Sequence, residues 1–307
     1  MILSTYGLCL LGAIALGLGL MAWMYGQEGA SRRAVGVFAP LAIALGAFGA
    51  RAYALLFSLM GACPKGPLFS ADPVHYAMGG ALLGVAGACV LASRIAKAPL
   101  GGLADALAPA GMLTLALARC AQVFADFGGS AAIERGPTLF PLAVQYADGQ
   151  WHMCVFFLEA LFAFAAMAYA LNMRTSKLGE RFVLTYAFWS MTQVLCDSLR
   201  EETVNFGFIG VQQIQYLILA LVILYAYTKI YYAKPYKKKE PTEILCWITA
   251  VECALAVVLM EFAIEYWVLP AALDYVIMAM AVCGVFMPVR LMVRRALRDE
   301  EVPWKDR

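Results

Sequence analysis

Long apolar runs separated by short polar segments dominate the chain. A helix needs about 20 mostly apolar residues to cross the hydrocarbon core of a bilayer. Nine segments have about that length, and they lie at residues 2–25, 35–61, 76–96, 103–124, 152–172, 182–199, 208–231, 244–265 and 271–293. Backbone groups in hydrocarbon must be paired within the segment, so each run is predicted to be a helix. The pattern predicts an all-α, polytopic membrane protein with about nine transmembrane helices.

Composition excludes the main soluble alternatives. Of the 307 residues, 63% are apolar and 14% are charged, whereas soluble domains have about 45–50% and about 25%. A soluble enzyme, a disordered protein and a secreted disulfide scaffold are therefore excluded. The net charge of +2 gives no reason to expect a nucleic-acid partner. The nine cysteines form no CxxC motif and no cluster with histidine, so neither a metal site nor a cofactor is expected.

Lysine and arginine are concentrated in alternate loops. One set of loops, together with the C-terminal tail, holds 18 of the 23 basic residues, whereas the other set holds only Lys65, Arg135 and Arg200. Cytoplasmic loops carry the excess of basic residues. We therefore predict an external N-terminus and a cytoplasmic C-terminus. The loop at 125–151 is then external, and its length and many turn residues suggest a functional loop.

Several charged residues interrupt the apolar runs, where a charge costs roughly 2.5–3.5 kcal/mol at mid-bilayer. They are Arg51, Arg119, Glu159, Asp197, Glu252 and Glu261, and their uncharged companions are Gln122, Gln193, Gln213 and Gln215. Gln122 follows Arg119 by three residues. Asp197 lies four residues after Gln193 and three before Arg200. Each set therefore lies on one stripe of a helix near the outer leaflet.

Two interpretations of these stripes remain open. A guanidinium near the outer leaflet can bind a phosphate at two points, which would make a phospholipid headgroup pocket. Alternatively, Arg119 forms an intramembrane ion pair with Asp197 or Glu159 that holds helices together. Arg51 has the same two interpretations, one structural and one lipid-binding.

Other polar and small residues have both a functional and a structural interpretation. Glu252 and Glu261 could form a proton or ion path, or could be paired in place. His75 and His152 lie near outer membrane boundaries, where either could act as a base. Asp105 could cap a helix start after Gly101-Gly102. Glycines at 79, 80, 84 and 87 give one span a small-residue face, which is typical of helix packing.

A series of short motifs runs through the first three quarters of the chain. They are STYGLCLLG with Tyr6, GARAYALLF at 49–57, MGGALLGV at 78–85, LADALAP at 103–109, HMCVFFLEAL at 152–161, TQVLCDSLREE at 192–202 and GFIGVQQIQYL at 207–217. In order and spacing they resemble the prolipoprotein diacylglyceryl transferases, bacterial enzymes that lipidate lipoproteins. Several positions depart from the family motifs: Met78 replaces a histidine, Gln122 an asparagine and Gln193 an arginine. Asp197 replaces a glutamate.

The resemblance implies a fold, a reaction and a set of site residues. It implies a seven-helix core at 1–232, followed at 233–307 by two additional helices with a basic tail. The implied reaction moves a diacylglyceryl group from phosphatidylglycerol to a cysteine of a lipoprotein precursor, at the outer face of the bacterial cytoplasmic membrane. Implied catalytic residues are Arg119, Asp197, His75 and Tyr6; implied substrate-binding residues are Arg51, Gly79, Gly80, Gln122, Glu159, Gln193 and Arg200.

Two alternatives to this reaction remain at the level of sequence. The chain could be a phospholipid-binding or scaffold protein that lost the catalytic base, because methionine at position 78 cannot accept a proton. It could also be a transporter that uses the acidic residues of the eighth span.

Overall fold

The computed structural model describes residues 5–27, 32–59, 76–125, 128–133, 139–147, 149–175, 177–200, 205–206, 209–233, 241–266 and 270–297. Within these ranges it contains nine α-helices, one short 3-10 helix and four short strands. In chain order they are α1 (Thr5–Gln27), α2 (Arg33–Leu59), α3 (Met78–Ala96), α4 (Leu100–Ala121), η2 (Gln122–Phe124), β1 (Ala143–Gln145), β2 (Trp151–Met153), α5 (Val155–Asn172), α6 (Glu180–Leu199), β3 (Asn205–Phe206), β4 (Ile209–Gly210), α7 (Val211–Tyr232), α8 (Pro241–Glu265) and α9 (Ala271–Leu297).

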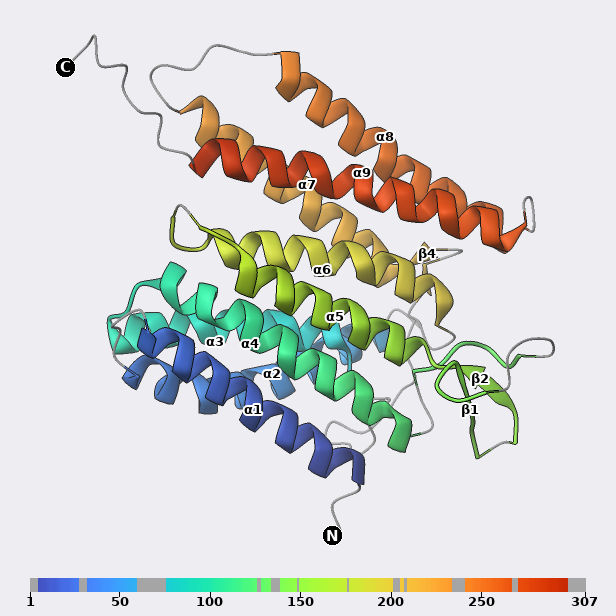
Figure 1. Ribbon diagram of the computed structural model, residues 1–307, viewed down its shortest axis with the longest axis horizontal. Coiled ribbons are helices and arrows are strands. Elements are labelled where there is room, and N and C mark those ends of the chain that lie inside the picture. Colours follow the sequence, from blue (N-terminus) through green and yellow to red (C-terminus); the bar gives the residue numbers. More distant parts are fainter. Residues whose placement is uncertain are drawn as a thin grey trace.

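The helices run alternately up and down in one bundle (Figure 1). α5 and α6 lie between the group α1 to α4 and the group α7 to α9, and the start of α1 and the end of α9 lie at opposite ends (Figure 1). Eight helices in the described part of the chain are long and apolar enough to cross a membrane. The prediction of an all-α, polytopic membrane protein is confirmed.

α6 is the helix that falls short of this apolar standard, and its position explains why. It contacts α4, α5, α7 and α9 and therefore lies inside the bundle. Twelve of its 20 residues are buried, among them Thr185, Ser190, Thr192, Gln193 and Asp197. A helix surrounded by protein can carry polar side chains because they face other helices instead of lipid.

The polar segment before α5 differs from the sequence prediction. Residues 125–151 were predicted to be a loop and the fifth helix to begin at 152. Instead β1 pairs antiparallel with β2, with Val144 opposite His152, and the helix begins at Val155. This hairpin, the shorter β3–β4 pair and the start of α1 lie at the same end of the bundle, here called the strand end (Figure 1).

Glycines set the tightest helix contact, between α2 and α3. A Cβ atom at Gly80 would collide with the carbonyl oxygen of Gly49, and one at Gly84 would collide with that of Leu45. The small-residue face predicted for the third span is therefore a packing surface, on which two backbones approach closely.

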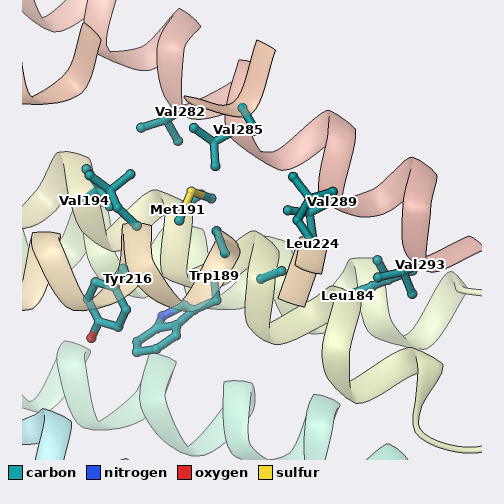
Figure 2. Close-up of a cluster of buried hydrophobic side chains, with 14 of the residues drawn as sticks. Leu184, Trp189, Met191, Val194, Tyr216, Leu224, Val282, Val285, Val289 and Val293 are labelled. Atoms are coloured by element: carbon teal, nitrogen blue, oxygen red, sulfur yellow. The ribbon is translucent and has the colours of Figure 1, made fainter. Parts of the chain in front are cut away.

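The largest hydrophobic cluster joins the last helix to the middle of the bundle. Val282, Val285, Val289 and Val293 follow one face of α9, and each is at most 5% exposed. Figure 2 shows Val282 and Val285 near Met191, Val289 beside Leu224 and Val293 beside Leu184, with Trp189 and Tyr216 on the other side of the cluster. α9 is thus packed against α6 and α7 along its length.

Asp105 makes a cap, but for a different helix from the one predicted. It is 2% exposed in α4, and its two carboxylate oxygens accept hydrogen bonds from the backbone N–H groups of Gly179 at 2.7 Å and Phe182 at 2.9 Å. These groups belong to the first turn of α6, where N–H groups lack partners within the helix. Asp105 therefore ties α4 to the start of α6, not to its own helix start.

Candidate functional site

The alternating topology brings several polar residues together at the strand end. α4 and α6 end there, whereas α1, α3, α5 and α7 begin there. Arg119 lies in the last turn of α4, Glu159 in the second turn of α5, and Arg200 caps the end of α6. Because a helix rises about 1.5 Å per residue, these three lie within roughly one turn of their helix ends at the strand end.

Glu159 is held between two arginines. Its Oε2 lies 2.7 Å from Nε of Arg119, and its Oε1 lies 3.4 Å from Nη1 of Arg200. The carboxylate is almost fully buried, and the two guanidiniums are only 11% and 12% exposed. Of the two interpretations that the sequence left open for Arg119, the structure shows the intramembrane ion pair, with Glu159 rather than Asp197 as the partner.

The rest of the Arg119 guanidinium is also engaged. Nη1 donates to Oε1 of Gln122 at 3.2 Å, so the three-residue spacing does place both side chains together. Nη2 lies 2.8 Å from Sδ of Met78, the residue at the position of the family histidine. Arg119 is 9% exposed, so little of its side chain reaches the surface.

Beside this ion pair lie polar atoms that make no hydrogen bond within the described residues. They are Nε2 of Gln193, Oδ2 of Asp197 and Oη of Tyr216. Each of the three residues is at most 6% exposed. Asp197 and Tyr216 are close enough to both Arg119 and Glu159 to interact with them electrostatically. A buried polar atom without a partner costs about 1–3 kcal/mol. Two donors and one acceptor beside a charged cluster match the needs of a polar ligand group.

A hydrogen-bonded chain links this cluster to α8. Gln213 accepts from the backbone N–H of Gly210 at 2.8 Å, and its Nε2 donates to the carbonyl of Val194 at 3.1 Å and to Glu261 Oε1 at 2.5 Å. Gly210 in turn lies against the carboxylate of Asp197. Glu261 therefore belongs to the surroundings of the site, although it lies beyond the seven-helix core.

Tyr6 and Arg51 lie differently with respect to the cluster. Tyr6 is in the first turns of α1, which packs on α4, and its hydroxyl is within electrostatic reach of Arg119. Arg51 is 7% exposed on α2, which packs on α3. It belongs to a helix pair outside the α4, α5 and α6 group that carries Arg119, Glu159 and Arg200.

The two glycines predicted to bind substrate have distinct surroundings. Gly80 is at the crossing with Gly49, so its visible role is helix packing. Gly79 lies beside the Tyr53 ring and the amide of Gln215, which are hydrogen-bonded to each other. Met78 is the first residue of α3, and His75 lies outside the described residues.

His152 is buried in β2, the strand that directly precedes α5. Its Nδ1 lies 2.8 Å from the carbonyl oxygen of Ser130, and its ring stacks on Tyr146 at 4.3 Å. A carbonyl oxygen can only accept, so Nδ1 carries the proton and Nε2 is the basic nitrogen. Gly129 packs against the Cβ atom of His152, and its neighbour Gly128 packs against the amide of Gln122.

The acidic residues of α8 do not line a common path. Glu252 and Glu261 are nine positions apart, which corresponds to opposite faces of a helix. Glu252 is exposed on the outer face of α8, whereas Glu261 is 6% exposed and bonded to Gln213.

The bundle, the buried ion pair and the strand-end hairpin define a multi-pass membrane protein with a polar site at one end of its helices. The family model for prolipoprotein diacylglyceryl transferase matches residues 1–231, which is most of the chain. The chain belongs to that family. The match ends in the last turn of α7, so the last two helices lie outside it. Comparison with curated proteins gave no match.

Sequence reasoning missed three contributors to the site: Met78 as a contact of Arg119, Tyr216, and the contact of Gln213 with Glu261. Tyr216 carried a weak signal, because it follows Gln213 by three residues on the same helix face. The contact between α7 and α8 carried no spacing signal at all, because its residues are far apart in the chain.

Proposed function

We propose that this protein transfers a diacylglyceryl group from phosphatidylglycerol to the cysteine thiol of a lipoprotein precursor, at the outer face of the bacterial cytoplasmic membrane. Family membership supports the lipid and the precursor as substrate classes. The observation that carries the proposal within this chain is the sharing of one carboxylate, Glu159, by two guanidiniums.

Glu159 holds Arg119 more firmly than it holds Arg200. The contact of Glu159 with Arg119 is the shorter, at 2.7 Å, and Arg119 is further fixed by Gln122. The contact with Arg200 is longer, at 3.4 Å, and Arg200 lies at the end of its helix. Arg200 can turn to an incoming phosphate while Glu159 keeps its ion pair with Arg119. We therefore assign phosphate binding to Arg200 and its positioning to Arg119 and Glu159.

The proposed step makes one bond and breaks one. The thiolate sulfur attacks the glyceryl carbon of the diacylglycerol unit that carries the phosphate ester. A carbon–sulfur bond forms, the carbon–oxygen bond to phosphate breaks, and its electron pair leaves with glycerol phosphate. Arg200 stabilises the charge that grows on the departing phosphate, as positioned donors do for developing anions. Gln193, Asp197 and Tyr216 offer two donors and one acceptor to the hydroxyls of the glycerol headgroup.

A base must take the thiol proton, and Met78 cannot do so. We assign this step to His152. Its bond to Ser130 fixes the imidazole with the basic nitrogen at Nε2, and its position in β2, directly before α5, supports this assignment. A thiolate is the nucleophilic form of cysteine, so proton removal determines the rate of attack.

The test is complementation of a bacterial strain depleted of its own diacylglyceryl transferase, together with release of glycerol phosphate from phosphatidylglycerol by the purified protein. Arg200→Gln should lower turnover at least about a hundredfold, which is the effect of removing one donor to a developing anion. His152→Asn should lower it while leaving lipid binding intact. Arg94→Gln, an exposed arginine at the other end of the bundle, is the matched control. Wild-type turnover in Arg200→Gln would refute the assignment.

A second candidate is a phospholipid-binding relative without turnover. Met78 favours it, because a thioether contacts Arg119 at the position of the family histidine. This candidate predicts that phosphatidylglycerol binds without release of glycerol phosphate, and that Met78→His restores some turnover. Complementation by the unchanged protein would exclude it.

A further inference from the structure

A second polar region lies at the end of the bundle opposite the strands. A cavity of about 550 Å³ opens there between α5 and α9, lined by Ala168, Tyr169, Asn172, Met173, Arg174, Arg290 and Arg294. A neighbouring depression of about 430 Å³ shares Arg290 and Arg294 and adds Met287, Leu291 and Arg295. These two neighbouring spaces along the end of α9 are together called the hollow here.

Packing explains why this hollow exists. At this level α5 and α9 meet through Tyr169 and Phe286, whose rings stand edge to face with centroids 6.4 Å apart. Beyond that contact α5 ends at Asn172. α9, which has about seven turns in total, continues past it to Leu297. The final turns of α9 therefore pass the end of α5, and their arginines line the space left beside it.

The hollow carries an excess of positive charge. Arg174, Arg290 and Arg294 line the cavity, and the nearby carboxylate of Glu180 lies 4.0 Å from Nε of Arg294. That Nε makes no hydrogen bond within the part of the chain that the structure describes. Arg290 and Arg294 are four residues apart on α9, so their guanidiniums project from one face. Paired guanidiniums suit the oxygens of a phosphate group.

The apolar rim decides what carries that phosphate. Met287 is 57% exposed and lies one turn before Arg290 on α9, and Leu291 is 38% exposed and lies one turn before Arg294. They belong to the membrane-facing side of a helix apolar enough to span the bilayer. A ligand with a phosphate at the arginines and hydrocarbon along Met287 and Leu291 satisfies both parts, whereas free phosphate satisfies only the first.

We propose that this hollow is a binding site for the phosphate of an anionic phospholipid in the leaflet opposite the transferase site. It is separate from that site, because Asn172 lies thirteen positions after Glu159 on α5, a distance of about 20 Å along the helix. The bound lipid bridges α5, which lies within the family match, and α9, which lies outside it. The lipid therefore fastens the last two helices to the core.

The experiment measures lipid affinity of the full chain in detergent. The protein is titrated with short-chain phosphatidic acid, phosphatidylcholine of the same chain length, and inorganic phosphate. We expect phosphatidic acid to bind at least about tenfold more tightly than either of the others. Arg290→Gln with Arg294→Gln should lower its affinity at least about tenfold. The matched control, Arg94→Gln with Lys177→Gln, removes two charges at the same end of the bundle outside the hollow and should leave the affinity unchanged.

Three results would overturn the proposal. One is equal affinity of the double variant and the wild type for phosphatidic acid. Another is equally tight binding of inorganic phosphate, which would make the ligand a soluble anion. The third result comes from wild-type protein in nanodiscs and serves if the double variant fails to fold. We expect phosphatidic acid to raise the unfolding temperature above that in phosphatidylcholine alone. No increase would refute the site. Retained binding in Arg119→Gln would separate this site from the transferase site.

Discussion

Replacing Glu159 by glutamine tests whether the shared carboxylate holds the strand end of the bundle together. The substitution keeps the size of the side chain and removes its charge. At 2.7 Å from Arg119, and with an effective dielectric constant of about 20, the attraction is about 6 kcal/mol; at 3.4 Å from Arg200 it is about 5 kcal/mol. Desolvation of all three groups offsets much of this gross attraction.

The net loss follows from what the substitution leaves behind. Two guanidiniums, each about one tenth exposed, would face each other without the anion between them. Breaking a buried ion pair by removing one partner costs about 3–5 kcal/mol. We expect a loss of that size in the free energy of unfolding, measured by titrating the purified protein with denaturing detergent.

Glu252→Gln provides the control with the same chemical change. Glu252 lies midway along α8 on its exposed face, so neutralising it should cost no stability. Combining Glu159→Gln with Arg119→Gln should cost less than the two single losses added together, because the second change removes a charge that the first left unpaired. If Glu159→Gln is as stable as Glu252→Gln, the carboxylate does not hold these helices and the reasoning fails.

Two further predictions concern the packing that supports the site. Gly80→Val should destabilise the protein by about 1–3 kcal/mol, since its Cβ would collide with the Gly49 carbonyl. Gly87→Val is the control on the same helix and should not destabilise the protein, because a Cβ there meets nothing within 4 Å. Equal thermal stability of the two variants would contradict the packing role. Asp105→Ala should cost about 1–3 kcal/mol and speed hydrogen exchange at the first amides of α6. Unchanged exchange at Gly179 and Phe182 would show that the cap does not stabilise that helix.

Local spacing predicted the polar stripes correctly but not their partners. Gln122 contacts Arg119 because both belong to one helix, whose geometry fixes neighbours three residues apart. Glu159 and Asp197 were equal candidates for the ion pair with Arg119, since each lies on a different helix. The packing of α4, α5 and α6 determines which carboxylate contacts the guanidinium. Residue spacing within one helix does not predict that packing.

The orientation in the membrane, the division into a core and two added helices, and the catalytic roles remain predictions from the sequence. The described arginines and lysines at the ends of α3, α7 and α9 lie at the end of the bundle opposite the strands, which is the end predicted to be cytoplasmic. Fusion of a reporter that is active only in the periplasm to the last residue would test this orientation. Activity of that reporter would contradict a cytoplasmic C-terminus.

The sequence by itself determined that this chain is a bundle of membrane-spanning helices, because an apolar run of bilayer length can satisfy its backbone only within its own helix. The order of short motifs was enough to indicate the family. Tertiary structure alone decided that Glu159 lies between Arg119 and Arg200, that Asp105 caps another helix, and that Arg290 and Arg294 line a cavity beside α5. These are contacts between segments distant in the chain, and they depend on helix faces and crossings that local hydrophobicity does not specify.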